Sequence, residues 1–90
     1  MKRASRKVEG GKLVAVDVAT ADGRVEDIEI SGDFFAHPEE SIHAVEDELV
    51  GTSVDAVEAT VQTVLAAEDA ELVGIDAADI ADLVAEVEAR

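Results

Sequence analysis

The sequence predicts an α+β domain, in which a small three-stranded antiparallel meander is followed by three helices packed on one face of the sheet. Up to about residue 32, apolar residues alternate with other residues, which is the period of a β-strand. Beyond Pro38, the only proline, apolar residues recur at every third or fourth position, which is the period of an amphipathic helix. Strands that come first in a chain and helices that come later are typical of the α+β class.

The expected strands span about residues 3–8, 12–20 and 25–32. Every second residue from Val14 to Val18 is a valine, so the second strand presents one continuous apolar face. Asp22-Gly23 predicts a tight hairpin turn after this strand, because both central residues of such a turn take a positive φ. Gly10-Gly11 predicts the turn before it, and the additional strand matters because an isolated hairpin is marginal in water.

The expected helices span about residues 38–50, 53–67 and 77–89. Pro38 suits the first position of the first helix, where its missing N–H is not needed, and the two glutamates after it suit the first turn. Asp76 and Asp79 have the spacing of a capping box at the start of the last helix. The segment 68–74 is expected to be a linker whose apolar residues cover the edge of the core.

Length and composition limit what the chain can be. Its 90 residues predict a single domain over 1–90, with residues 1–6 as a flexible basic tail or an edge strand. No cysteine is present, which excludes a disulfide framework and a thiol nucleophile. No apolar run reaches about 18 residues, so no membrane span is expected and a cytoplasmic location is the default. So small a core leaves little room for a ligand pocket of roughly 300–1,000 Å³.

Charge is distributed very unevenly along the chain. Overall, 22 acidic and 7 basic side chains give a net charge of −15, yet residues 1–12 carry five basic side chains and one acid. No Lys or Arg lies between Val25 and Ala89. Such acidity, combined with 48% hydrophobic residues, indicates a halophilic-type surface rather than disorder, because molar salt shortens the Debye length to about 3 Å. The same charge argues against nucleic acid as a partner, since phosphate binding requires a cationic surface.

Motifs for metal binding and for independent catalysis are weak. His37 and His43 are six residues apart and do not share a helix face, so surface roles are favoured over metal binding. A faint likeness to a calcium loop around Gly23 fails because Val18 stands where the first ligand belongs. Carboxylate pairs will occur anywhere in a chain with 22 acids. The sequence therefore predicts no metal site and no catalytic residue of its own.

The first candidate site segment is the turn formed by Gly10, Gly11 and Lys12. Glycine-rich loops can cradle phosphates through their backbone N–H groups. This one lacks the full Walker spacing and leads into a strand, so a tight turn is the simpler interpretation. Lys12 nevertheless stands out, because few lysines remain in so acidic a protein.

The second candidate segment is formed by Asp33, Phe34 and Phe35, which include the only two aromatic residues of the chain. Adjacent side chains on a strand point to opposite faces, so the two phenylalanines cannot both point inward from a regular strand. One is expected to anchor the core and the other to face a partner protein, because aromatic residues are enriched at protein interfaces.

The segments KVEGGKLVAVDV and, after a hairpin, IEISGDFFAHPEESIHAVEDELVG resemble the small accessory domain of lipoate–protein ligases. The resemblance runs from about Lys7 to Glu86, and its most specific part pairs the GGKL turn with GDFF-x-x-P-E-E some twenty residues later. The later helices match in pattern only. The family usually has proline where this chain has Glu9, which should affect only the turn. Because the chain starts with Met1 and has no large domain, we expect the separate small-subunit form, with a truncated ligase as the alternative.

The resemblance implies a reaction and a partner. Such ligases join lipoate to ATP, giving lipoyl-adenylate and pyrophosphate, and then transfer the lipoyl group to a lysine of an acceptor protein. The acceptors are lipoyl domains of 2-oxoacid dehydrogenases and the glycine-cleavage carrier protein. ATP, Mg and lipoate are therefore expected on a partner catalytic subunit, and no cofactor on this chain alone. Activation develops negative charge at phosphorus, so Lys12, Arg24 and the basic N-terminal segment are the cations that could assist.

The leading hypothesis is a noncatalytic accessory subunit of a bipartite lipoate–protein ligase, needed for ATP-dependent activation of lipoate. Gly10, Gly11 and Lys12 would complete the active site of the catalytic subunit, and the segment 33–35 would face that subunit. The alternative is a freestanding protein-interaction adaptor without a role in activation. A stand-alone enzyme is disfavoured, because a nucleophile, a metal cluster and a pocket are all missing.

Overall fold

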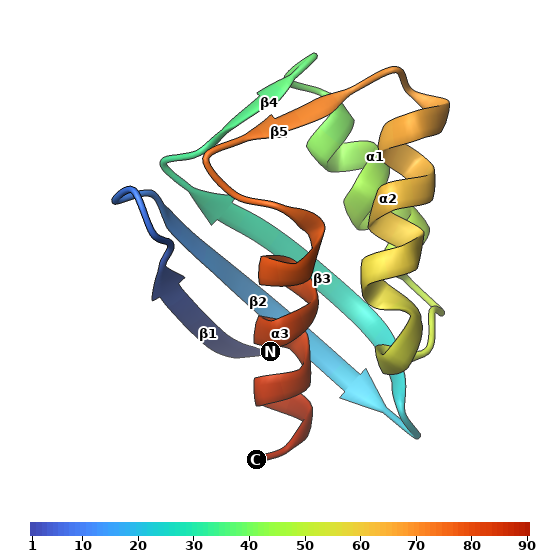
Figure 1. Ribbon diagram of the computed structural model, residues 1–90. Coiled ribbons are helices and arrows are strands. Elements are labelled where there is room, and N and C mark those ends of the chain that lie inside the picture. Colours follow the sequence, from blue (N-terminus) through green and yellow to red (C-terminus); the bar gives the residue numbers. More distant parts are fainter.

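The computed structural model describes all residues from 1 to 90, and it shows a three-stranded sheet that carries its helices on one face (Figure 1). This arrangement confirms the predicted α+β class of strands followed by three helices. The elements in chain order are β1 (Lys2–Lys7), β2 (Leu13–Ala21), β3 (Arg24–Gly32), β4 (Phe35–His37), α1 (Ser41–Leu49), a 3-10 turn η1 (Val54–Ala56), α2 (Val57–Ala67), β5 (Glu71–Val73) and α3 (Ala77–Glu88).

The main sheet has the order β1-β2-β3, and both pairings are antiparallel. The alternating valines of β2 are fully buried, and their cross-strand neighbours Ala4, Ile28 and Ile30 are buried too, so the predicted apolar face is confirmed. Helix α3 packs over β1 and β2, while α1 packs over β3. The opposite face of the sheet carries no helix. At the hairpin between β2 and β3, Asp22 and Gly23 both take a positive φ, as predicted, at 55° and 74°.

One hydrophobic core joins the sheet to the helices and contains 18 buried residues. Helix α3 contributes Ile80, Leu83, Val84 and Val87, which form the stripe expected from the sequence. The predicted capping box is present, because the Asp76 and Asp79 side chains each accept a hydrogen bond from the other's backbone N–H. The longest helix has 12 residues, and none of the helices combines the length and apolarity needed to span a membrane.

The first helix begins later than predicted. We expected Pro38 at its first position, but α1 starts at Ser41. The Pro38 carbonyl accepts hydrogen bonds from the Ser41 backbone N–H at 3.0 Å and from the Ser41 hydroxyl at 2.6 Å. These bonds fold residues 38–40 into a turn before the helix, so Glu39 and Glu40 precede its first turn instead of occupying it. Ser41 is the one fully buried polar residue, which explains why it needs this partner.

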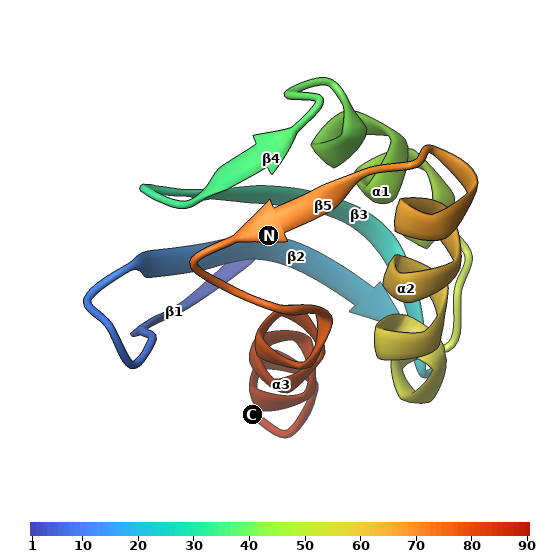
Figure 2. The ribbon, with the colours of Figure 1, turned by 45° about the horizontal axis from the view of Figure 1, so that its top comes forward.

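The segment 68–74 is not the plain linker that we predicted, because it contains β5. This strand pairs antiparallel with β4, with Phe35 opposite Val73 and His37 opposite Glu71, and the two form a second, separate sheet. Figure 2 shows this short ribbon lying over one end of the main sheet. Its central pair points inward: Ala36 is buried, and Leu72 packs against the core, as expected for a residue that covers the core edge.

Candidate functional site

The structure brings the two candidate segments together at one end of the molecule. The β1–β2 turn and the β3–β4 connection lie side by side there in both views (Figures 1 and 2). The Leu13 backbone N–H donates to the Asp33 carboxylate at 2.5 Å, and the Asp33 N–H donates back to the Leu13 carbonyl at 3.1 Å. This reciprocal pair joins residues that are 20 positions apart in the sequence. One of the two Asp33 carboxylate oxygens is therefore occupied by a hydrogen bond within the chain.

Gly32 permits this close approach. A Cβ atom at Gly32 would lie 2.1 Å from the Leu13 carbonyl oxygen, and the Gly32 φ of 149° is one that L residues rarely adopt. Since the obstructing atom belongs to the backbone, no side-chain rotation could relieve the contact. Gly32 in the GDFF segment therefore has a structural role, because it lets β3 lie close to the start of β2.

Lys12 is held by the β4–β5 sheet. Its side chain runs over Gly74, where a Cβ atom would come within 2.6 Å of the Lys12 Cγ. Its ammonium group lies 5.1 Å from the centre of the Phe35 ring, within the range of a cation–π interaction. The path of the Lys12 side chain is thus set by Gly74 and Phe35, two residues that lie far from Lys12 in the sequence.

The two phenylalanines face different surroundings. Phe34 is half-buried and packs against the core, whereas Phe35 is 54% exposed. Phe35 stacks on His37 with ring centroids 6.3 Å apart, and its cross-strand neighbour Val73 is also exposed. We call Lys12, Phe35, His37 and Val73 the Lys12 patch. It combines an ammonium group with exposed aromatic and apolar surface, which suits contact with another molecule.

The four arginines are already paired inside the chain, as five contacts show. They are Arg3 with Asp17 at 2.6 Å, Arg6 with Asp79 at 3.3 Å and Asp82 at 2.7 Å, Arg90 with Glu86 at 3.2 Å, and Arg24 with the Gly51 carbonyl at 2.9 Å. The hydrogen bond to Asp82 raises the pKa of Arg6 above its ordinary value, despite partial burial, so this arginine stays charged. Arg24 starts β3, at the far end of the sheet from Lys12, so it cannot assist at the same site.

The three lysines, in contrast, make no ion pair within the chain. Lys7 ends β1 and Lys12 follows the Gly10-Gly11 turn, so two unpaired ammonium groups flank this turn. Lys2 lies at the other end of β1, opposite Val18. Among the basic side chains of β1, Lys7 alone therefore brings an unpaired ammonium group to the end of this ordered edge strand that adjoins the Gly10-Gly11 turn.

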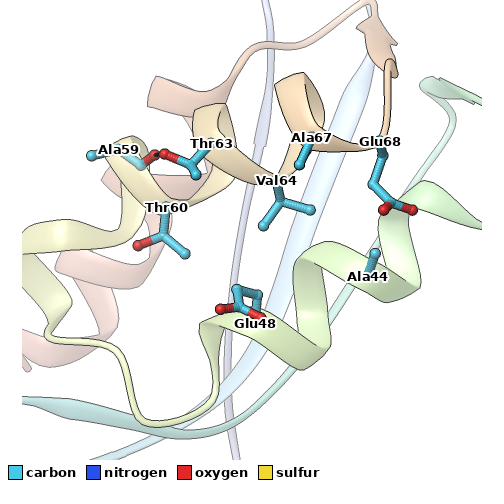
Figure 3. Close-up of a pocket in the computed structure, with 8 residues that line it drawn as sticks. All are labelled: Ala44, Glu48, Ala59, Thr60, Thr63, Val64, Ala67 and Glu68. Carbon is cyan, nitrogen blue, oxygen red and sulfur yellow. Dashed lines mark hydrogen bonds between the residues drawn. The ribbon is translucent and has the colours of Figure 1, made fainter.

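The largest hollow of the molecule is elsewhere, between α1 and α2, with a volume of about 490 Å³. Its lining side chains come from both helices (Figure 3): Ala44, Glu48, Ala59, Thr60, Thr63, Val64, Ala67 and Glu68. The charged members are two glutamates, and no lysine or arginine lines the groove. Nucleotide phosphates would meet only negative charge there.

No group of three or more His, Asp or Glu side chains gathers where it could hold a metal ion. The two histidines that could have suggested one are separated. His37 stacks on Phe35, while the His43 ring lies 3.2 Å from the Glu46 carboxylate on α1.

Comparison with known proteins places these features in context. A family model described as "Bacterial lipoate protein ligase C-terminus" matches residues 1–84. Lipoate-protein ligase A subunit 2 of Thermoplasma acidophilum is 44% identical over 45 residues, which are 50% of this chain and 48% of that relative. The aligned stretch thus spans about half the length of this relative.

A solved structure is similar over most of the chain. It comes from the structural analysis of an archaeal lipoylation system, a bi-partite lipoate protein ligase and its E2 lipoyl domain from T. acidophilum. The TM-score is 0.74 at 27% identity, and the match covers 92% of this chain and 94% of that chain.

Proposed function

Because this chain belongs to the family of the bacterial lipoate protein ligase C-terminus, we propose that it is the noncatalytic accessory subunit of a two-part lipoate–protein ligase. Its role is in the ATP-dependent activation of lipoate to lipoyl-adenylate, which precedes transfer to a lysine of the acceptor protein. The observation that carries the proposal is the family match over nearly the whole chain, together with similarity to a protein named as subunit 2 of such a ligase.

The chemistry of the chain fits an accessory role better than independent catalysis. The groove between α1 and α2 is lined by Glu48 and Glu68 without a cation, so it would repel the phosphates of ATP. The carboxylates do not gather into a site that fits Mg²⁺. Lipoate, ATP and Mg²⁺ are therefore assigned to the catalytic subunit, and no step of the reaction is assigned to this chain alone.

The Lys12 patch is the part of this chain that we assign to the partner's active site. Negative charge develops around the α-phosphate during adenylation, and a positioned cation stabilises it in a water-poor site. Lys12 has an unpaired ammonium group whose path is fixed by Gly74 and Phe35. Gly10 and Gly11 place Lys12 at the end of the turn, with φ values of 98° and 94° that favour glycine.

Phe35 is the residue that we assign to the contact with the catalytic subunit. Its ring is more than half exposed and adjoins exposed Val73, so docking would remove both from water. Asp33 and Phe34 support this contact from within: Asp33 ties the segment to Leu13, and Phe34 anchors it in the core. The acceptors of the lipoyl group are, in this proposal, lipoyl domains of 2-oxoacid dehydrogenases or the glycine-cleavage carrier protein.

The test combines the purified chain with the catalytic subunit of a lipoate–protein ligase from the same organism. Pyrophosphate release from ATP and lipoate should require this chain. Lys12→Ala should slow pyrophosphate release while transfer from preformed lipoyl-adenylate changes less. The control is Lys2→Ala, which removes another unpaired lysine at the far end of β1. Equal pyrophosphate release with and without this chain would refute the accessory role.

The second candidate function is a protein-interaction adaptor without a part in activation. The exposed Phe35 and Val73 favour it, since apolar surface serves docking whether or not chemistry follows. The same experiment separates the two functions. An adaptor would bind the catalytic subunit through Phe35, yet leave pyrophosphate release unchanged.

A further inference from the structure

The outer edge of β1 is an open hydrogen-bonding surface. The Val8 N–H donates to the Lys12 carbonyl at 2.7 Å, and the β1–β2 register continues from this pair without a shift. In an antiparallel pair, hydrogen-bonded positions alternate. The backbone groups of Ala4 and Arg6 therefore point toward β2, whereas those of Arg3, Ser5 and Lys7 point away from the sheet.

The hydrogen bonds at the C-terminus support this assignment. The Arg90 guanidinium donates to the Arg3 carbonyl at 3.0 Å, which requires that this carbonyl face outward. Ser5 and Lys7 have no such partner among the backbone or side-chain hydrogen bonds of the chain. No element lies beyond β1 in the sheet (Figure 1). The stretch from Ser5 to Lys7 thus offers outward N–H and C=O groups that are free to pair.

The opposite edge of the sheet, formed by β3, is covered by other residues of the same chain. Along β3, the Ile30 N–H donates to the Glu46 carboxylate of α1 at 2.7 Å. Near the start of β3, Val25 exchanges hydrogen bonds with Gly51 and Thr52. The protein therefore covers one edge with its own residues and leaves the β1 edge available.

Charge indicates what could pair with this edge. β1 carries four basic side chains, and Lys2 and Lys7 make no ion pair, in a chain whose net charge is −15. The Lys7 side chain stands on the open face of the sheet, because Ala4 and Arg6 alternate toward the helices. A strand added beside β1 would place its own side chains next to Lys7 on that face. Carboxylates there would be attracted, and basic side chains repelled.

A second copy of this chain does not meet this requirement. Antiparallel self-pairing centred on Ser5 would set Arg3 of each copy opposite Lys7 of the other. Parallel self-pairing would set like charges side by side along the whole strand. Both arrangements are unfavourable, and lysines on an edge strand are a common obstacle to self-association.

We propose that an extended, acidic segment of the catalytic subunit adds to the sheet as a fourth strand, pairing with the outward groups of Ser5 and Lys7. The proposal rests on the proposed function for the identity of the partner protein. β1 ends three residues before Gly10, so such a segment would reach the Gly10-Gly11 turn and approach Lys12. One docked strand would thereby fix the position of the turn that carries Lys12.

Amide hydrogen exchange measured by NMR tests the inference residue by residue. In the free chain, the Ser5 and Lys7 amides should exchange faster than those of Ala4 and Arg6, which bond to β2. In the complex with the catalytic subunit, exchange at Ser5 and Lys7 should slow by at least about tenfold, since a paired N–H must open before it exchanges. The Ala4 and Arg6 amides should change little by comparison.

A pair of variants at Ser5 tests the contact by affinity. Ser5→Pro removes the outward N–H and leaves the bonds between β1 and β2 intact, because edge strands tolerate proline where the N–H faces solvent. Ser5→Ala removes the hydroxyl and keeps the N–H, so it is the matched control. Ser5→Pro should weaken binding of the catalytic subunit by about tenfold, the scale of a lost backbone hydrogen bond. Ser5→Ala should change binding by less than about twofold.

A charge variant keeps the test decisive if Ser5→Pro lowers the melting temperature. Lys7→Glu should weaken the complex and Lys2→Glu should weaken it less, because Lys2 lies beyond the free stretch. The added strand is refuted if the complex forms while the Ser5 and Lys7 amides stay unprotected, or if Ser5→Pro and Lys7→Glu leave its affinity unchanged. Either result leaves the accessory function standing. Failure of the wild-type chain to bind the catalytic subunit refutes both. Concentration-dependent protection of Ser5 in the isolated chain would identify a second copy as the occupant and overturn the proposal.

Discussion

Replacing Gly32 by alanine should destabilise the domain far more than an ordinary surface substitution. The new Cβ would lie 2.1 Å from the Leu13 carbonyl oxygen, so the backbone of β3 or β2 must move by about an ångström to reach a normal contact. That movement separates Asp33 from Leu13. The variant therefore combines backbone strain with the loss of a reciprocal pair of hydrogen bonds.

The expected magnitude follows from these contributions. An L residue at positive φ costs about 1–2 kcal/mol. Each lost hydrogen bond between Leu13 and Asp33 costs about 0.5–1.5 kcal/mol. The free energy of unfolding should thus fall by about 2–5 kcal/mol, out of a total of roughly 5–13 kcal/mol for a domain of this length. At about 4–8 °C per kcal/mol, the melting temperature should drop by roughly 10–40 °C.

Gly51→Ala is the matched control for this experiment. Gly51 also has a positive φ, of 87°, but a Cβ atom there meets nothing within 4 Å. Its cost is therefore the backbone strain alone, about 1–2 kcal/mol. Urea or thermal unfolding followed by circular dichroism gives both values. Equal losses in the two variants would show that the contact with Leu13 does not matter, and the account of Gly32 would be wrong.

Three further predictions concern the Lys12 patch and the acidic surface. Gly74→Ala should displace Lys12, because the new Cβ would lie 2.6 Å from the Lys12 Cγ. Pyrophosphate release should then fall as in Lys12→Ala, while the loss of stability stays close to that of Gly51→Ala. Unchanged pyrophosphate release would mean that Lys12 does not need this position. Phe35→Ala should leave unfolding within about 0.5 kcal/mol of wild type but weaken binding of the catalytic subunit by about 2 kcal/mol, as measured by calorimetry. Val50→Ala, at a residue that is 51% exposed outside the patch, is its control, and equal effects on binding would count against Phe35. Raising KCl from about 0.1 M to 1 M should raise the melting temperature, because the Debye length falls from about 10 Å to 3 Å and the salt then screens the repulsion among the carboxylates. Coincident melting curves at the two salt concentrations would contradict a salt-adapted surface.

Much of the fold follows from local sequence patterns. The alternating valines of β2, the Asp22-Gly23 turn and the Asp76–Asp79 capping box all involve residues close together in the sequence, and all appear as predicted. Each of these features is determined by neighbours within a few positions. Local chemistry is then sufficient to predict the element, although not its packing.

The elements that were missed depend on partners far away in the sequence. β4 and β5 are three residues each, too short for a detectable period, and each exists because it pairs with the other across more than 30 positions. The late start of α1 depends on Ser41, whose buried hydroxyl bonds to Pro38. A serine three residues after a proline is compatible with a helix that begins at either residue, so the sequence alone could not decide.

The candidate site, too, could be predicted only in part, because its arrangement depends on residues far apart in the sequence. Composition was enough to single out Lys12 and the two phenylalanines, because such residues are rare in this chain. Their proximity could not be predicted, since it depends on the Leu13–Asp33 hydrogen bonds and on β5, which brings Gly74 beneath Lys12. Gly74 was overlooked for that reason. A glycine after a short apolar run carries no signal until its neighbour in space is known.

Recognition of a partner cannot depend on long-range charge if this domain works at molar salt. With a Debye length of about 3 Å, the ammonium group of Lys12 acts only on a group that it touches. The contacts that keep their strength under those conditions are apolar burial, which many salts reinforce, and backbone hydrogen bonds. The structure offers one of each beside Lys12: the exposed pair Phe35 and Val73, and the open edge of β1. These short-range contacts would hold Lys12 within touching distance of the developing charge, which is the only distance at which its own charge would count.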